Sequence, residues 1–170
     1  MTASATQPRT ELQRLAALYR HESATTLKVL RAYPADQAEL TPHPSGNSAM
    51  RLLHTFMIEN ALMERALRGE MGKSRDLPPP PASWNEGVSS FEAGVARVGQ
   101  MLDAMSDEQF GGSVPWFTAP KTMGQIPTRD FLEFMIHDSI HHRGQLSIYL
   151  RMAGAKVPSI YGPSKDEPWN

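Results

Sequence analysis

The side chains best suited to chemistry in this sequence are two histidines that stand four residues apart, His137 and His141. If the segment around them is helical, both imidazoles project from one face, with their Cβ atoms about 6 Å apart. This is the spacing at which a helix presents two imidazoles to one metal ion, as in the His-Glu-x-x-His motif. Between the two histidines, Asp138 and Ser139 replace the glutamate that serves as the base in zinc proteases. The sequence therefore does not predict zinc-protease chemistry.

A third histidine, His54, lies within an apolar stripe that includes Met50 and Met57. This position predicts a side chain that points into the protein interior, where an imidazole needs a partner. One alternative is a core histidine bonded to a carbonyl or a hydroxyl. We favour a shared metal site of His54, His137 and His141, because three buried imidazoles without a metal would compete for few acceptors.

The other three histidines are expected outside this site. His21 and His43 are predicted to be solvated. His142 is rotated by about 100° from His141, so it is expected to bond to Asp138 four residues earlier rather than to bind the metal.

Four carboxylates are candidates for supporting roles. Asp138 or Glu133 can orient a ligand imidazole, although a solvated helix face is the simpler interpretation for each. Glu59 and Glu64 are interpreted as surface carboxylates, so the sequence names no general base.

Four further side chains have two alternative interpretations. Arg143, Gln145, Trp116 and Phe117 would line an entrance above the metal in one of them. In the other interpretation, which we favour for each residue, Arg143 and Gln145 satisfy polar groups in the C-terminal half of the last helix. Trp116 and Phe117 then cover the core.

The composition narrows the chemistry. The 170 residues include six histidines and no cysteine, which excludes disulfides, thiolate zinc sites and iron-sulfur clusters. Any reactive sulfur must therefore arrive with the substrate. A net charge of -1 provides no basic surface for nucleic acid or anionic lipid, and neither is an expected partner. No stretch has the length of a signal peptide or a membrane span, so we expect a cytoplasmic protein.

Helical periodicity and breaking residues define the elements that must position these side chains. Four helices are predicted at about residues 10–33, 48–68, 84–105 and 128–152. A tetraproline segment at 78–81 lies in the connection between the second and third helices, and a long loop or small hairpin at 106–126 joins the third to the fourth. These elements predict an all-α four-helix bundle with two long connections, in one domain over residues 1–170 with an irregular tail from about residue 155.

The sequence resembles the DinB/YfiT-like superfamily of small metal-binding four-helix bundles over nearly the whole chain, and three segments carry the resemblance. They are Leu-Leu-His54-Thr-Phe, the stretch His137-Asp-Ser-Ile-His-His-Arg-Gly-Gln-Leu146, and the tail from 149 to 164. The resemblance implies that His54, His137 and His141 bind a divalent ion. Nickel or zinc is the expected metal, with manganese and iron as further candidates. It also implies a homodimer.

Related members include mycothiol-dependent maleylpyruvate isomerases and bacillithiol transferases. We therefore expect a metal-dependent hydrolase or a small-thiol-dependent transferase that acts on a small molecule, thiol-containing in the second case. Three imidazoles leave open coordination positions for either chemistry. The alternative is a non-catalytic metal-binding or stress-related binding module, from which an enzyme is distinguished by an open position beside a cavity.

Overall fold

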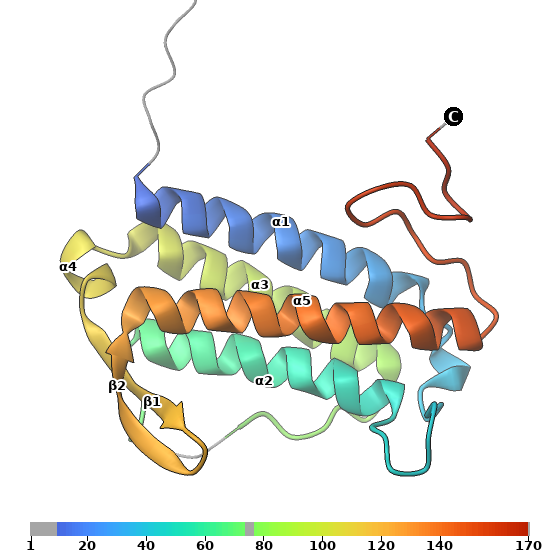
Figure 1. Cartoon of the computed structure of the whole chain (residues 1–170), viewed down its shortest axis with the longest axis horizontal. Helices are drawn as coiled ribbons and strands as arrows, with labels where there is room; N and C mark the ends of the chain where they lie inside the picture. Colours follow the sequence, from blue (N-terminus) through green and yellow to red (C-terminus); the bar gives the residue numbers. More distant parts are fainter. Residues whose placement is uncertain (1–9, 74–76, 170) are drawn as a thin grey trace, which may run out of the picture.

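The computed structural model describes residues 10–73 and 77–169, and four long helices dominate it (Figure 1). They are α1 (Glu11–Ala32), α2 (Ala49–Leu67), α3 (Trp84–Ala104) and α5 (Thr128–Met152). The shorter elements are a 3-10 turn η1 (Ala35–Gln37), a helical turn α4 (Asp107–Phe110), and an antiparallel hairpin of β1 (Ser113–Ala119) and β2 (Thr122–Pro127). The predicted all-α four-helix bundle is confirmed, and the hairpin lies in its second long connection.

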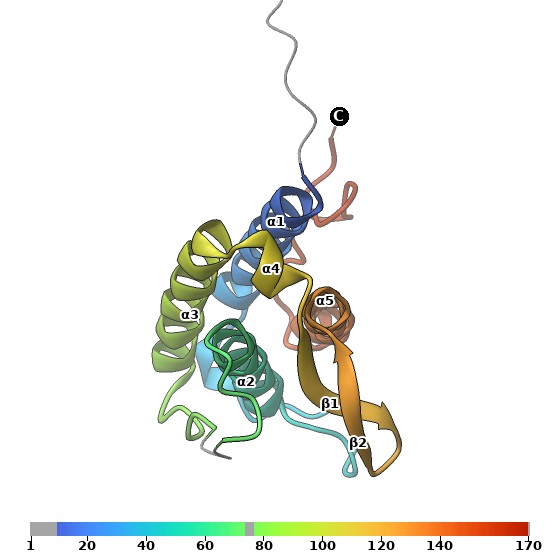
Figure 2. The ribbon, with the colours of Figure 1, turned by 90° about the vertical axis from the view of Figure 1, so that its left-hand side faces the viewer.

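The helices occupy the four corners of the bundle when it is viewed along its axis (Figure 2). Helices α1 and α2 lie on opposite corners, and each packs against both α3 and α5. Helices α1 and α5 run in one direction, whereas α2 and α3 run in the other (Figure 1). Because α2 and α3 are parallel neighbours, the chain between them must return along the bundle, and the extended proline segment suits that path.

Local side chains explain where the helices start and stop. Thr10 forms a capping box with Gln13 at the start of α1, and Ser48 and Ser83 cap α2 and α3. The final helix stops before Gly154, which has the positive φ of 73° that favours glycine. The four helix ranges agree with the prediction to within one residue at every end, because capping and termination depend on neighbouring residues.

The apolar core is divided into two clusters, one toward each end of the bundle. One cluster includes Leu15, Val98 and Phe131, and the other includes Leu30 and Leu53. Buried polar residues from α1, α2 and α5 lie between them, and we call this middle zone the polar layer. Its members include Glu22, Ser23, Thr26, Glu59, Asn60 and Arg143.

No helix in the described ranges is both long enough and apolar enough to cross a lipid bilayer.

Candidate metal centre

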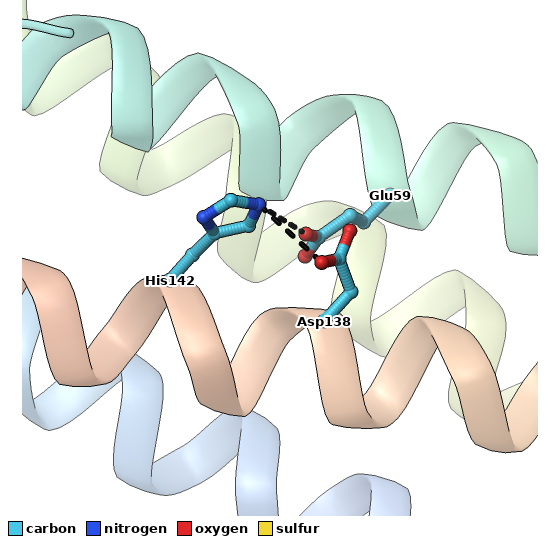
Figure 3. Close-up of side chains that lie close together, drawn as sticks. All are labelled: Glu59, Asp138 and His142. Atoms are coloured by element: carbon cyan, nitrogen blue, oxygen red, sulfur yellow. Dashed lines mark ion pairs between the residues drawn. The ribbon is translucent and has the colours of Figure 1, made fainter. Parts of the chain in front are cut away.

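A cluster of two carboxylates and one imidazole lies in the polar layer between α2 and α5 (Figure 3). The His142 Nε2 atom is 3.6 Å from Oδ1 of Asp138 and 3.8 Å from Oε1 of Glu59. Within the described residues, this is the one group of at least three histidine, aspartate or glutamate side chains whose ligand atoms all lie within 4.8 Å of one another. Asp138 and His142 share a face of α5 because they stand four residues apart, and Glu59 reaches them from α2.

Glu59 is buried without a hydrogen-bond partner. The residue is 5% exposed, and neither carboxyl oxygen has a hydrogen-bond partner among the described residues. Burial raises the pKa of Glu59 well above its ordinary value of 4.5, and the neighbouring Asp138 carboxylate acts in the same direction, whereas the Ser139 side chain acts in the opposite direction. An ionised carboxylate at such a position is costly, so Glu59 either keeps a proton or faces a cation.

The hydrogen bond to Gln145 defines which nitrogen of His142 carries the proton. The His142 Nδ1 atom lies 3.0 Å from Oε1 of Gln145, which can only accept, so Nδ1 is the donor. Gln145 in turn donates from Nε2 to the His141 Nε2 atom, also at 3.0 Å. In a neutral His142 ring, Nε2 therefore has its lone pair directed toward the two carboxylates.

The donor chemistry of this cluster fits a divalent cation. The Glu59, Asp138 and His142 side chains all present lone pairs to one small region, and such acceptors repel one another unless a proton or a cation lies between them. Carboxylate oxygens and a neutral imidazole are ordinary ligands of zinc, iron and manganese. Gln145 has the outer role common at metal sites, because it holds the far nitrogen of the ligand ring.

The three histidines favoured by the sequence analysis lie elsewhere. His54 is half-buried, with Nε2 2.8 Å from the carbonyl oxygen of Pro78, whereas His137 and His141 are exposed. His54 and Glu59 are five residues apart on α2, so their side chains point about 140° apart. The described structure does not gather these histidines, and nothing tests the metal-binding set, which stays a prediction.

The expectations for His21 and His43 agree with the structure, whereas the hydrogen bond expected for His142 is not formed. His21 and His43 are exposed. His142 lies 3.6 Å from Asp138, beyond hydrogen-bond distance, and its hydrogen bond is to Gln145. The Asp138–His142 pair faces Glu59 and is therefore part of the candidate centre.

The interpretation of Glu59 and Glu64 as surface carboxylates is wrong. Both are buried, but Glu64 is paired with Arg97 at 2.9 Å and with Arg68 at 3.3 Å. A signal for the cluster was present in the spacing of α5, where Asp138 and His142 continue the buried stripe. That stripe is Phe131, Met135, Asp138, His142, Leu146 and Tyr149, with successive spacings of three or four residues.

Arg143 lies inside the bundle and donates to α1 and the tail, so neither the entrance nor the favoured role in the C-terminal half of α5 is correct. It is 1% exposed and donates to a carboxylate oxygen of Glu22 at 2.7 Å. It also donates to the hydroxyl of Tyr161 at 2.5 Å, and that hydroxyl donates to Glu22 at 2.7 Å. This buried ion pair joins α1 and α5 in the polar layer and anchors the tail that follows α5.

Comparisons with known proteins agree with this architecture. The model of the DinB family matches residues 6–169. The uncharacterized protein YrdA of Bacillus subtilis (strain 168) is 49% identical over 43 residues, a stretch that spans 25% of this chain and only 26% of YrdA.

Solved structures share the fold at low sequence identity. A DinB-like protein from Bacillus cereus ATCC 10987 has a TM-score of 0.73 at 18% identity, covering 86% of this chain and 95% of that one. YfiT from Bacillus subtilis, described as a probable metal-dependent hydrolase with an unusual four-helix bundle topology, has a TM-score of 0.62 at 13% identity, covering 91% and 95%. The family match extends over nearly the whole sequence, and this chain therefore belongs to the DinB family.

Proposed function

We propose that this protein is a divalent-metal-dependent hydrolase of a small molecule, with Glu59, Asp138 and His142 as its metal ligands. The observation that carries the proposal is the Glu59 carboxyl group, which is buried and without a hydrogen-bond partner among the described residues. A cation supplies the missing counter-charge, and the adjacent Asp138 and His142 side chains complete a ligand set. The likeness to YfiT, a probable metal-dependent hydrolase, supports the same function.

The ligand set bears on the identity of the metal. Two carboxylates and a neutral imidazole offer two hard oxygen atoms and one borderline nitrogen, which favours zinc, manganese or ferrous iron. Nickel, expected from the three-histidine set, is also compatible with an imidazole ligand and is included in the test below. Three protein ligands leave at least one position open, as catalytic sites require.

The charge of the site favours hydrolysis over thiol transfer. Two carboxylates balance the charge of a divalent ion, so the loaded site is neutral, whereas three imidazoles would leave it at +2. A neutral site gains less from an incoming thiolate than a +2 site does, but it still accepts an uncharged carbonyl. When bound, the ion supplies Lewis-acid polarisation of such a carbonyl. Gln145 keeps the His142 ring in one orientation and tautomer.

Metal content tests the ligand assignment. Untagged protein equilibrated with zinc, manganese, nickel or ferrous iron should retain about one ion per chain by plasma mass spectrometry. His142→Ala and Asp138→Asn should lose that ion, whereas the matched changes His137→Ala and His141→Ala on the same helix should retain it. The reverse pattern would support the three-histidine set, and less than about 0.2 ions per chain in the wild type would refute metal binding altogether.

The visible spectrum of the cobalt-loaded protein tests for an open coordination position. Acetohydroxamate should change this spectrum if a position is open. Hydrolysis of a panel of esters and amides should disappear on chelation and return when the metal is restored. An unchanged spectrum together with no metal-dependent hydrolysis would instead indicate a non-catalytic metal-binding module, and a rate that requires an added small thiol would indicate the transferase.

A further inference from the structure

An apolar hollow lies between the hairpin and the first half of α5. Trp116, Phe117, Ile126 and Phe134 line it, and its volume is about 480 Å³, within the range of small-molecule pockets. The hairpin stands on the outer side of the α2–α5 pair, the two helices that hold the candidate metal ligands (Figure 2). The hollow and the metal centre therefore share one side of the bundle.

Helical geometry places one lining residue of the hollow about one turn from a proposed metal ligand. Phe134 and Asp138 stand four residues apart on α5, so Phe134 lies about 6 Å along the helix axis from a proposed ligand and on nearly the same face. Phe134 is 46% exposed and Phe117 is 54% exposed, although both are large apolar side chains. Clustered exposed apolar side chains beside a polar site are typical of a binding surface.

The wall of the hollow is anchored rather than loose. The Trp116 ring packs edge-to-face on Phe131 of the core, with 5.1 Å between ring centroids and an interplanar angle of 76°. The same ring contacts Phe117 at 5.5 Å and Phe134 at 6.3 Å. An aromatic wall fixed in this manner needs little ordering when an apolar group binds, which favours affinity.

We propose that this hollow is a substrate subsite that receives an aromatic or branched apolar group, placed about one helical turn from the reacting carbonyl. The inference rests on the proposed function and names its substrate class: a small ester or amide with an apolar substituent near the scissile bond. Lys121 is the one charged residue among the described lining, so the subsite accepts a neutral or anionic substituent and disfavours a cationic one.

Hydroxamates of different size provide the test, because their head group binds the metal and their substituent probes the hollow. In calorimetric titrations of the cobalt-loaded protein, phenylacetohydroxamate should bind about tenfold or more tightly than acetohydroxamate. Phe134→Ala and Phe117→Ser should abolish most of this ratio while leaving the cobalt content and the acetohydroxamate affinity unchanged.

Ile148→Ala is the matched control. Ile148 is also an exposed apolar residue of α5, at 62%, but it lies fourteen residues from Phe134, or about 21 Å along the helix. This variant should keep the wild-type ratio of affinities.

The outcomes separate the two proposals. Equal affinities for both hydroxamates in the wild type would overturn the subsite and leave the metal centre standing. Absence of binding by either compound would overturn the open metal site and the subsite with it. If Phe134→Ala keeps the ratio but converts a dimer into a monomer in sedimentation experiments, the hollow is an interface with a second copy and the subsite is overturned.

Discussion

Replacing Glu59 by methionine should stabilise the metal-free protein and at the same time abolish metal binding. The Glu59 carboxyl group is buried, and neither oxygen has a hydrogen-bond partner among the described residues. An unsatisfied buried polar group costs about 1–3 kcal/mol. Methionine has a similar length and an equal preference for helix, so it should recover about that amount without straining α2.

The dependence on pH provides a second signature of the same carboxyl group. The pKa of Glu59 is raised in the folded protein, so folding of the metal-free chain takes up a proton above pH 4.5, the ordinary value. The associated stability is fully present below about pH 4.5 and is lost as the pH rises toward the folded pKa. The advantage of Glu59→Met should therefore grow with pH over that window.

Thermal and urea unfolding of metal-free protein measure the effect. The melting temperature should rise by about 2–4 °C for each kcal/mol gained. Adding metal at about one hundred times its Kd should stabilise the wild type by about 2.7 kcal/mol and leave Glu59→Met unchanged.

Glu64→Met is the matched control, because Glu64 is also buried on α2 but is paired with Arg97 and Arg68. Its loss should destabilise the protein by about 0.5–1.5 kcal/mol, a modest amount since both arginines are half-exposed and can rehydrate. If metal-free Glu59→Met unfolds more easily than the wild type by more than about 1 kcal/mol, the carboxyl group has a stabilising partner and the reasoning fails.

Three further predictions concern the centre and its supports. Metal binding must displace the proton of Glu59. Calorimetry should therefore show that the Kd of the metal decreases by about tenfold per pH unit above pH 4.5, until the folded pKa is reached. A Kd that does not change with pH would contradict the assignment. Arg143→Met leaves Glu22 buried without its cation and should cost about 3–5 kcal/mol in urea unfolding, whereas a loss below about 1 kcal/mol would show that the pair is dispensable. A Cβ at Gly87 would lie 2.6 Å from a leucine of α2, so Gly87→Ala should destabilise the protein by about 1–3 kcal/mol. A Cβ at Gly144 meets nothing within 4 Å, so Gly144→Ala should stabilise it by about 0.5–1 kcal/mol, and equal melting temperatures of the two variants would contradict this packing.

The helices were predictable because their determinants are local. Apolar stripes, the capping residues Thr10, Ser48 and Ser83, and the terminating Gly154 all act within a few residues of the helix that they define. The direction of the helices was not predictable in this manner. It depends on which helices pack side by side, and the parallel placement of α2 and α3 requires the long return connection.

The candidate site shows the limit of spacing arguments. Helix α5 contains two pairs at the same spacing, His137 with His141 and Asp138 with His142. A shift of one residue rotates a pair by about 100° around the helix, so both cannot face α2. Counting histidines favours the first pair, whereas the packed helix directs the second toward Glu59.

The sequence alone determined the number and extent of the long helices, the absence of cysteine chemistry, and the membership of a family of four-helix bundles. Only the tertiary structure decided which side chains meet, because the burial of Phe131, Leu132 and Leu146 against the other helices sets the rotation of α5 about its axis. That rotation places Asp138 and His142 in the polar layer and leaves His137 exposed. Side chains on different helices are brought together by packing, which the spacing within one helix does not encode.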